Sequence, residues 1–303
     1  HDLNRGWSVR RVARTLDRPV STEDRERADL VEALVPRLRG ADNQTFVFDL
    51  HSTSSPSAPF LTLADTLDNR AYARLLGMPL VLGLEEQIDD AMLEYLGGFG
   101  PIALGVEAGQ HDDPVSVDVH EAAIWMALVE AGCLARDTSL FDLAEAKRRI
   151  ALARAGLPHV FEVVYRRCVE PGDGFTMDPG YHNFQRVSEG QRIAQTHEGP
   201  VLVPEDGWLF LPLYQELGDD AYFLVRPVRP VWLRISGVLR RLGTARILPL
   251  LPGVHRARER RDTYLVDRRI ARCLVVQFFH LLGYRRVRGT PHVVVFRKQG
   301  SKD

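Results

Sequence analysis

A histidine and a glutamate stand where two apolar runs of this sequence end. His51 follows the run Phe46–Leu50, and Glu107 follows the run Ile102–Val106. Such runs are typical of buried parallel strands, and open α/β sheets bind ligands at the carboxyl ends of their strands. Asp49, two residues before His51, makes this histidine a candidate metal ligand or general base. We expect a partly desolvated Glu107, whose pKa would lie above that of a free carboxyl group, as suits a general base.

Motifs of several other chemistries are missing or misplaced. The sequence has no G-x-S-x-G elbow, no G-x-x-x-x-G-K phosphate loop and no G-x-G-x-x-G turn after a strand. This disfavours a serine hydrolase, an NTPase and a dinucleotide-dependent enzyme. His159 and Glu162 do spell H-x-x-E, but positions i and i+3 of a strand point to opposite faces. We therefore interpret this pair as a chance match.

A second cluster of ionisable residues follows the glutamate, made of His111, Asp112, Asp113, Asp118 and His120. Asp112 and Asp113 are better explained as capping groups of the next helix. His111 lies four residues past Glu107 and could line the mouth of a site. His51 taken alone could be a loop histidine without a role, and its combination with Glu107 is what favours a site.

Strands that alternate with helices are expected to position these side chains. Ser21 or Thr22 caps a predicted helix that ends at Gly40, and Asp113-Pro114 starts one that runs to about Gly132. This alternation predicts βαβ units and a mostly parallel sheet. Residues 1–20 are predicted to be irregular and basic. The other predicted elements are strands at 46–50, 79–84 and 102–106 and helices at 63–75, 85–96 and 139–153.

The pattern changes after residue 156. Short alternating runs broken by glycine and proline fill 159–228 and predict a small antiparallel β domain. An apolar stripe predicts a helix over about Tyr264–Leu282, and His292–Phe296 is predicted to be a closing strand. We therefore expect an α/β domain at 1–156 with a mostly parallel sheet flanked by helices, a small β domain at 157–230, and a basic segment, helix and strand at 231–303.

The composition is that of an ordinary globular protein. The 303 residues are 45% hydrophobic and 26% charged, with a formal net charge of -1, which argues against a nucleic-acid-binding protein overall. No apolar run reaches membrane-spanning length and no signal peptide is recognised, so we expect a cytoplasmic protein without a membrane partner. Cys133, Cys168 and Cys273 are widely spaced, which predicts reduced core thiols.

Residues 226–261 are arginine-rich and nearly free of acidic residues. A solvated basic face is the preferred interpretation of this segment. A docking surface for nucleic acid or anionic lipid is the alternative, and a steep salt dependence of binding would support it.

Three motifs occur in an order that resembles one enzyme family. They are Asp2-Leu3-Asn4-Arg5, Asp49-Leu50-His51-Ser52-Thr53 and Gly105-Val106-Glu107-Ala108-Gly109-Gln110. Together they resemble the succinylglutamate desuccinylase/aspartoacylase family, which are zinc deacylases built on the carboxypeptidase fold. The resemblance covers most of the first 130 residues. It implies a zinc-dependent deacylase that hydrolyses the amide bond of an N-acyl amino acid or a related small carboxylate amide.

The resemblance also implies roles for individual residues. His51 corresponds to the third ligand of a single zinc ion, which would activate water and polarise the scissile carbonyl. Glu107 corresponds to the carboxylate that activates this water and passes its proton to the leaving amine. Asn4 and Arg5 correspond to the pair that grips a substrate carboxylate. The family's second domain adds a tyrosine, for which the candidates are Tyr181, Tyr214 and Tyr222.

The sequence departs from the family in two ways. The family's first two zinc ligands come from an H-x-x-E motif that precedes the Asn-Arg pair, whereas nothing precedes His1, so we expect an N-terminally truncated chain. Residues 97–100 stand where aspartoacylase-like members carry a substrate-binding arginine, which argues against an aspartate-type substrate. One ligand of three is too few for a stable catalytic zinc. The alternative function is therefore a non-catalytic carboxylate-binding protein of the same fold.

Overall fold

The computed structural model describes residues 3–40, 43–88, 90–154, 156–170, 172–215, 219–257, 263–267, 279–289 and 293–298. Its first half contains the helices α1 (Val9–Asp17), α2 (Thr22–Arg39), α3 (Leu67–Leu76), α4 (Met92–Gly97), α5 (Pro114–Glu130) and α6 (Leu143–Ala153). The strands of this half are β1 (Phe46–Thr53), β2 (Phe60–Leu63), β3 (Leu80–Leu82) and β4 (Ile102–Gln110), with a 3₁₀ turn at Leu84–Glu86.

The second half is richer in strands. These are β5 (Val160–Cys168), β6 (Thr176–Met177), β7 (Arg186–Val187), β8 (Arg192–Thr196), β9 (Gly199–Leu202), β10 (Gly207–Phe210), β11 (Asp220–Pro227), β12 (Val254–Arg256), β13 (Thr263–Asp267), β14 (Tyr284–Gly289) and β15 (Val293–Lys298). Helix α7 (Pro230–Arg241) and the 3₁₀ segment η2 (Thr244–Leu250) separate β11 from β12.

The central sheet of the described chain is mixed, in the order β1-β4-β2-β3-β5-β11-β10-β7. The pairs β1–β4, β2–β3 and β3–β5 are parallel, whereas β2 runs antiparallel to β4 and β11 antiparallel to β5. The α/β class is thus confirmed. Three of the four described pairs from β1 to β5 are parallel, as predicted, and the sheet as a whole is mixed because antiparallel pairs follow from β5 to β7. The short connection 54–59 leads from β1 past β4 to β2 without a crossover helix, and β2 runs in the opposite direction because parallel strands need a longer connection.

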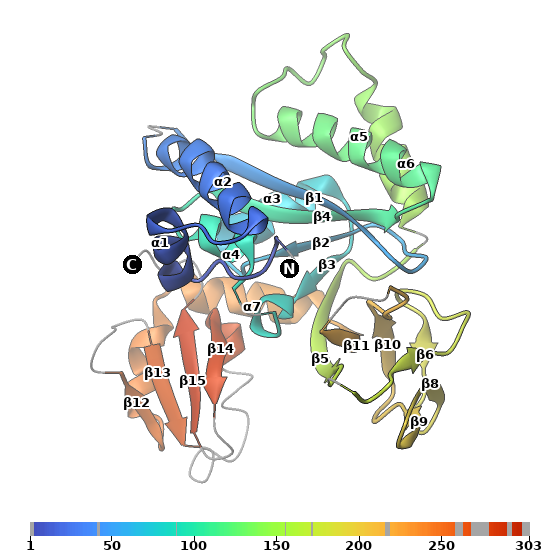
Figure 1. Cartoon of the computed structure of the whole chain (residues 1–303). Coiled ribbons are helices and arrows are strands. Elements are labelled where there is room, and N and C mark those ends of the chain that lie inside the picture. Colours follow the sequence, from blue (N-terminus) through green and yellow to red (C-terminus); the bar gives the residue numbers. More distant parts are fainter. Residues whose placement is uncertain are drawn as a thin grey trace.

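Four of the strands after residue 157 continue this sheet. β5 pairs with β3, and β11, β10 and β7 extend the sheet beyond β5. A small antiparallel part exists as predicted, since β6, β8 and β9 form a separate three-stranded sheet, whereas the four-stranded sheet β12-β13-β15-β14 was not predicted (Figure 1). The division into domains at 156 and 230 stays a prediction.

Several local predictions need correction. Val9–Asp17 is helical where an irregular segment was predicted, because Val12 packs into a core with Trp7 and tertiary packing supports this short helix. Tyr264 lies in strand β13, where the alternating burial has period two, and does not begin a helix. The middle of that predicted helix, 268–278, lies outside the described residues. The closing strand is confirmed as β15.

Two cysteines are also placed differently from the prediction. Cys133, just after α5, and Cys168, at the end of β5, are exposed free thiols, so the core position predicted for them is wrong. Both lie at the ends of elements, where the chain leaves the core. Cys273 lies outside the described residues.

Helices cover both faces of the first half of the sheet (Figure 1). The even-numbered residues of β4, such as Leu104 and Val106, pack with α3, α5 and α6 in one core. Trp7 and Val47 pack with α1, α2 and α4 on the opposite face. Because side chains alternate along a strand, the odd-numbered residues of β1 and β4 share this second face.

Helix α7 joins the central sheet to the C-terminal sheet through a buried ion cluster. Asp65, with a side chain that is 0% exposed, pairs with Arg70 and with Arg240, whose Nη2 lies 2.8 Å from Asp65 Oδ2. Arg70 Nη1 donates to Ser236 Oγ at 3.2 Å, and Arg240 Nε donates to the Leu281 carbonyl at 3.0 Å. We call Asp65, Arg70, Ser236 and Arg240 the Asp65 cluster.

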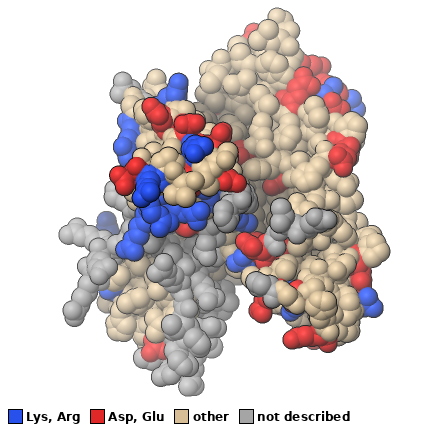
Figure 2. Space-filling view, viewed as in Figure 1, with Lys and Arg blue, Asp and Glu red and all other residues tan. Residues whose placement is uncertain are grey.

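The described surface is unevenly charged. Figure 2 shows Lys and Arg side chains gathered over α1 and Asp and Glu side chains more widely over the opposite side of this face. Arg10, Arg14 and Arg18 are exposed at α1. Within the described residues, no helix is both long and apolar enough to cross a membrane.

Candidate active site

His51 and Glu107 are direct neighbours on the parallel strands β1 and β4. Residues at equal register on neighbouring parallel strands point to the same face, so the two side chains meet. Both lie inside their strands, because β1 continues to Thr53 and β4 to Gln110, and not in the loops that were predicted. β1 also lies at the edge of the described sheet and is only half-buried, which corrects the fully buried strand predicted for Phe46–Leu50.

Asp49 belongs to the same group of side chains. His51 Nε2 lies 2.8 Å from Asp49 Oδ1, and the two side chains are 37% and 15% exposed. Residues 49 and 51 share one face of β1, which brings the carboxylate beneath the ring. A carboxylate in this position favours the protonated form of the imidazole electrostatically.

Glu107 is half-buried, and its carboxyl oxygen Oε2 is closed off from solvent. Burial raises its pKa to about 7, the nearby His51 lowers this value and Asp49 raises it further. Oε2 of Glu107 is buried and has no hydrogen-bond partner among the residues that the structure describes. A carboxyl group that titrates near neutral pH can both accept and return a proton, so the predicted general base is chemically suited to its role.

His120 of α5 completes the group from behind the strand, and the sequence interpretation gave it no role. Its ring hydrogen-bonds to the backbone of His51, while burial lowers its pKa. Its Nδ1 is buried without a hydrogen-bond partner within the described part of the chain. His120 lies beside Val119 and Ala123, on the face of α5 that packs on the sheet. This position in the sequence could have indicated that its side chain reaches the strands. We call Asp49, His51, Glu107 and His120 the Glu107 cluster.

Hydrogen bonds between the strand tips hold this cluster in place. Thr53 Oγ1 donates to the Ser55 carbonyl at 2.7 Å, and the His111 amide donates to the Thr53 carbonyl at 3.0 Å. His111 Nδ1 lies 2.8 Å from Ser52 Oγ, so this histidine borders the tip of β1 beside the candidate site. The cap at Asp113 is confirmed, since its side chain accepts from the amide of Val115 at 2.9 Å.

Asn4 and Arg5 lie on the same face of the sheet as Glu107. Asn4 Oδ1 accepts from the amide of Met92, at the start of α4, which packs on this face. Arg5 Nη2 lies 3.6 Å from Asp220 Oδ2, at the start of β11. Both side chains therefore have protein partners, and their role in gripping a substrate carboxylate stays a prediction.

The residues described do not by themselves form a zinc site. No group of three or more His, Cys, Asp or Glu side chains that could hold a metal ion is found among them. His51 is one candidate ligand, and its Nε2 lies 2.8 Å from Asp49 Oδ1. A catalytic zinc needs three protein ligands. The donor set in the described chain is thus incomplete.

The other candidate residues are not gathered at this site. His159 contacts Arg154, and Glu162 pairs with Arg226 at 2.7 Å. The H-x-x-E pair His159 and Glu162 is therefore not a pair of metal ligands. Tyr222 is fully buried in the core of the β region. The Tyr214 hydroxyl donates to the Asp178 carbonyl and the Tyr181 hydroxyl to the Arg192 carbonyl. The choice among the three tyrosines stays open.

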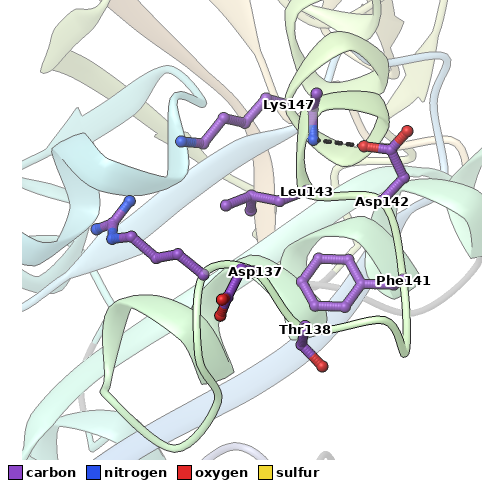
Figure 3. A pocket seen from close by; sticks show the side chains of 8 residues that line it. Asp137, Thr138, Phe141, Asp142, Leu143 and Lys147 are labelled. Carbon is purple, nitrogen blue, oxygen red and sulfur yellow. Dashed lines mark hydrogen bonds between the residues drawn. The ribbon is translucent and has the colours of Figure 1, made fainter.

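A surface pocket of about 550 Å³ lies apart from these residues, between the end of α5 and the start of α6 (Figure 3). Asp142 forms part of its wall and also caps α6, accepting from the amide of Ala144 at 2.8 Å. None of the candidate site residues lines it. The lining residues are Arg136, Asp137, Thr138, Phe141, Asp142, Leu143, Ala144 and Lys147.

Comparison with known proteins finds relatives in structure but not in sequence. No protein-family model and no curated protein matches the chain. A succinylglutamate desuccinylase/aspartoacylase from Rhodobacter sphaeroides matches with a TM-score of 0.51 at 18% identity, over 75% of this chain and 68% of that one. The succinylglutamate desuccinylase from Vibrio cholerae matches with a TM-score of 0.50 at 16% identity, over 76% of this chain and 65% of that one.

A third structure, the enzyme from Vibrio parahaemolyticus, matches at 15% identity with a TM-score of 0.47, over 76% of this chain and 66% of that one. The chain thus spans about two thirds of the length of these proteins. At such identities the likeness concerns the fold. The resemblance drawn from the three motifs is confirmed at this level: the chain has the fold of the succinylglutamate desuccinylase/aspartoacylase proteins.

Proposed function

We propose that this protein is an amide hydrolase that deacylates N-acyl amino acids or related small carboxylate amides, with Glu107 as its proton-transfer group. The observation that carries the proposal is the cross-strand pairing of His51 with a half-buried Glu107. The shared fold supports it, because two solved proteins of this fold are named as a succinylglutamate desuccinylase/aspartoacylase and a succinylglutamate desuccinylase.

In this proposal Glu107 acts twice. Its carboxylate first accepts a proton from the water that attacks the amide carbonyl, and then returns this proton to the nitrogen of the leaving amine. A pKa of about 7 leaves both forms populated near neutral pH, which suits a group that must gain and lose a proton in one turnover. Asn4 and Arg5 are proposed to bind the substrate carboxylate.

We also propose zinc as the cofactor, with His51 as one of its ligands. Zinc bound there would supply a Lewis acid for the amide carbonyl and its attacking water. Since the described residues hold only part of a ligand set, metal analysis of the purified chain tests this step separately from activity. A chain that retains about one zinc ion after dialysis, and a His51→Ala variant that does not, would support the assignment.

The experiment for the hydrolase is turnover of a panel of N-acyl amino acids with and without added zinc. We expect Glu107→Gln to lower the rate by roughly 10²–10⁴-fold, as general acid–base groups commonly do. Glu162→Gln is the matched control, because this carboxylate also lies on a strand but pairs with Arg226 away from the cluster. Equal turnover by Glu107→Gln and the parent chain would contradict the role of Glu107.

The incomplete ligand set favours one alternative, a carboxylate-binding protein of the same fold without catalysis. In that case calorimetry would detect binding of N-acyl amino acids, and no product would form at any zinc concentration. Arg5→Gln would weaken this binding, and Glu107→Gln would not.

A further inference from the structure

Helix α7 carries a row of apolar side chains on the face that points away from the protein. Its inner face contributes Leu233 to the main core, and Ser236 and Arg240 to the Asp65 cluster. A helix with one buried face normally carries polar residues opposite. The opposite face here is apolar at positions i, i+4, i+7 and i+11. This outer stripe consists of Val231, Ile235, Val238 and Leu242, which are 37% to 71% exposed.

The exposed apolar surface continues beyond the outer stripe. Trp232 is half exposed beside it, and in η2, which contacts α7, Leu250 is 81% exposed and Ile247 is exposed as well. Single exposed apolar residues are ordinary, but seven of them on one helix and the 3₁₀ segment that follows it are typical of an interaction surface.

Arginines flank this surface without any acidic neighbours in the sequence. Arg234 and Arg241 border the outer stripe and are exposed, as are Arg229 and Arg246. Residues 221–258 contain no Asp or Glu. Residues 226–303 contain 19 Lys and Arg against four Asp and Glu, whereas residues 1–225 contain 20 against 36. The exposed arginines and the absence of acidic residues from 221–258 thus give the surroundings of the outer stripe a positive charge.

We propose that α7 and η2 form a docking surface for an anionic phospholipid bilayer. The outer stripe would enter the boundary between headgroups and acyl chains, with Trp232 at the interface and the flanking arginines on lipid phosphates. Nucleic acid fits less well, because it engages arginines and aromatic rings but leaves the aliphatic outer stripe without a partner. A second copy would bring arginines of like charge together. The attachment is peripheral and requires no spanning helix.

Flotation of the full chain with vesicles tests the proposal. We expect binding to vesicles that mix phosphatidylcholine with phosphatidylglycerol, and little to phosphatidylcholine alone. The double variant Val238→Ser/Leu242→Ser should weaken binding about tenfold or more, and Arg234→Gln/Arg241→Gln about fivefold per arginine. Leu152→Ser on α6 and Arg74→Gln on α3, both exposed, are matched controls that should bind like the parent. Brominated lipid should quench Trp232, and Trp232→Phe should remove this quenching.

Three outcomes would overturn the proposal. The first is no binding to anionic vesicles at low salt by a parent chain with a cooperative unfolding transition. The second is binding to an oligonucleotide that the arginine variant loses and the Val238/Leu242 variant keeps, which would assign the surface to nucleic acid. The third is a dimer in sedimentation equilibrium that Leu242→Ser dissociates, which would assign it to a second copy. Unfolding midpoints equal to that of the parent exclude misfolding of the variants.

Discussion

The Asp65 cluster and the Glu107 cluster each place a carboxylate beside basic side chains. Only in the Asp65 cluster do both carboxylate oxygens have hydrogen-bond donors in the part of the chain that the structure describes. Both Asp65 oxygens accept from guanidinium groups, and those guanidiniums also donate to Ser236 Oγ and to backbone carbonyls. In the Glu107 cluster, Glu107 Oε2 and His120 Nδ1 are buried without hydrogen-bond partners among the described residues. Buried polar groups are normally satisfied. The comparison therefore separates a cluster that stabilises the fold from one that is poised for chemistry.

The largest expected effect on stability comes from removing the carboxylate of the Asp65 cluster. Asp65→Ala leaves two buried guanidiniums without their carboxylate and should lower the free energy of unfolding by about 3–5 kcal/mol. Denaturant unfolding measures this loss. Asp68→Ala is the control, an exposed carboxylate three residues away in the first turn of α3, and should change stability by less than about 1 kcal/mol. Similar losses for both variants would mean that the Asp65 cluster contributes no more than a surface charge.

The second prediction concerns the pH dependence of the Glu107 cluster in metal-free protein. The pKa of Glu107 is raised to about 7 from 4.5, so the folded state binds this proton more tightly than the unfolded state. The group thus stabilises the fold below pH 4.5, and this contribution of about 3 kcal/mol is lost as the pH rises through 7. Glu107→Gln should flatten the stability profile in that window. Parallel profiles for parent and variant would contradict the buried, protonated carboxyl group.

The third prediction tests how closely strands β4 and β2 approach each other at Gly105 and Thr62. A Cβ at Gly105 would overlap Thr62 Oγ1. Gly105→Ala should therefore destabilise the protein by about 1–3 kcal/mol, as overpacked cores do. Adding Thr62→Ala should restore part of this loss in urea unfolding, because it removes the overlapping oxygen. Strictly additive effects of the two substitutions would show that the strands do not approach closely there.

The smallest expected loss of stability concerns an exposed ion pair, with which the other three losses can be compared. Glu162 and Arg226 form an ion pair at 2.7 Å with side chains 31% and 61% exposed. Solvent screens such a pair, so Arg226→Gln should lower the free energy of unfolding by at most about 1 kcal/mol. The same unfolding measurement applies. A larger loss would mean that this pair behaves like the buried Asp65 cluster.

Features encoded within a few residues were predicted well. The cap at Asp113 depends on local chemistry, and so does the capping box that Ser21 forms with Asp24. The meeting of His51 with Glu107 was also anticipated, because neighbouring parallel strands align their carboxyl ends. That expectation needed only two recognisable strands and no knowledge of their neighbours.

Features set by tertiary packing were not predictable from local patterns. β2 has four residues and was not predicted as a strand, and its direction makes the sheet mixed. The role of His120 depends on which face of α5 meets β1. The position of Arg5 beside Asp220 depends on contacts more than two hundred residues apart in the chain. Periodicity within one element carries no information on such distant partners.

The link between Asp65 and Arg240 spans 175 residues of chain and has a consequence during biosynthesis. At 5–20 residues per second, the second guanidinium leaves the ribosome roughly 10–35 seconds after the aspartate with which it pairs. Until then the nascent chain can pair Asp65 with Arg70 alone. Arg240 therefore joins the Asp65 cluster only after every strand of the central sheet has been translated, and a chain that stops before α7 lacks the link from Asp65 to the Leu281 carbonyl.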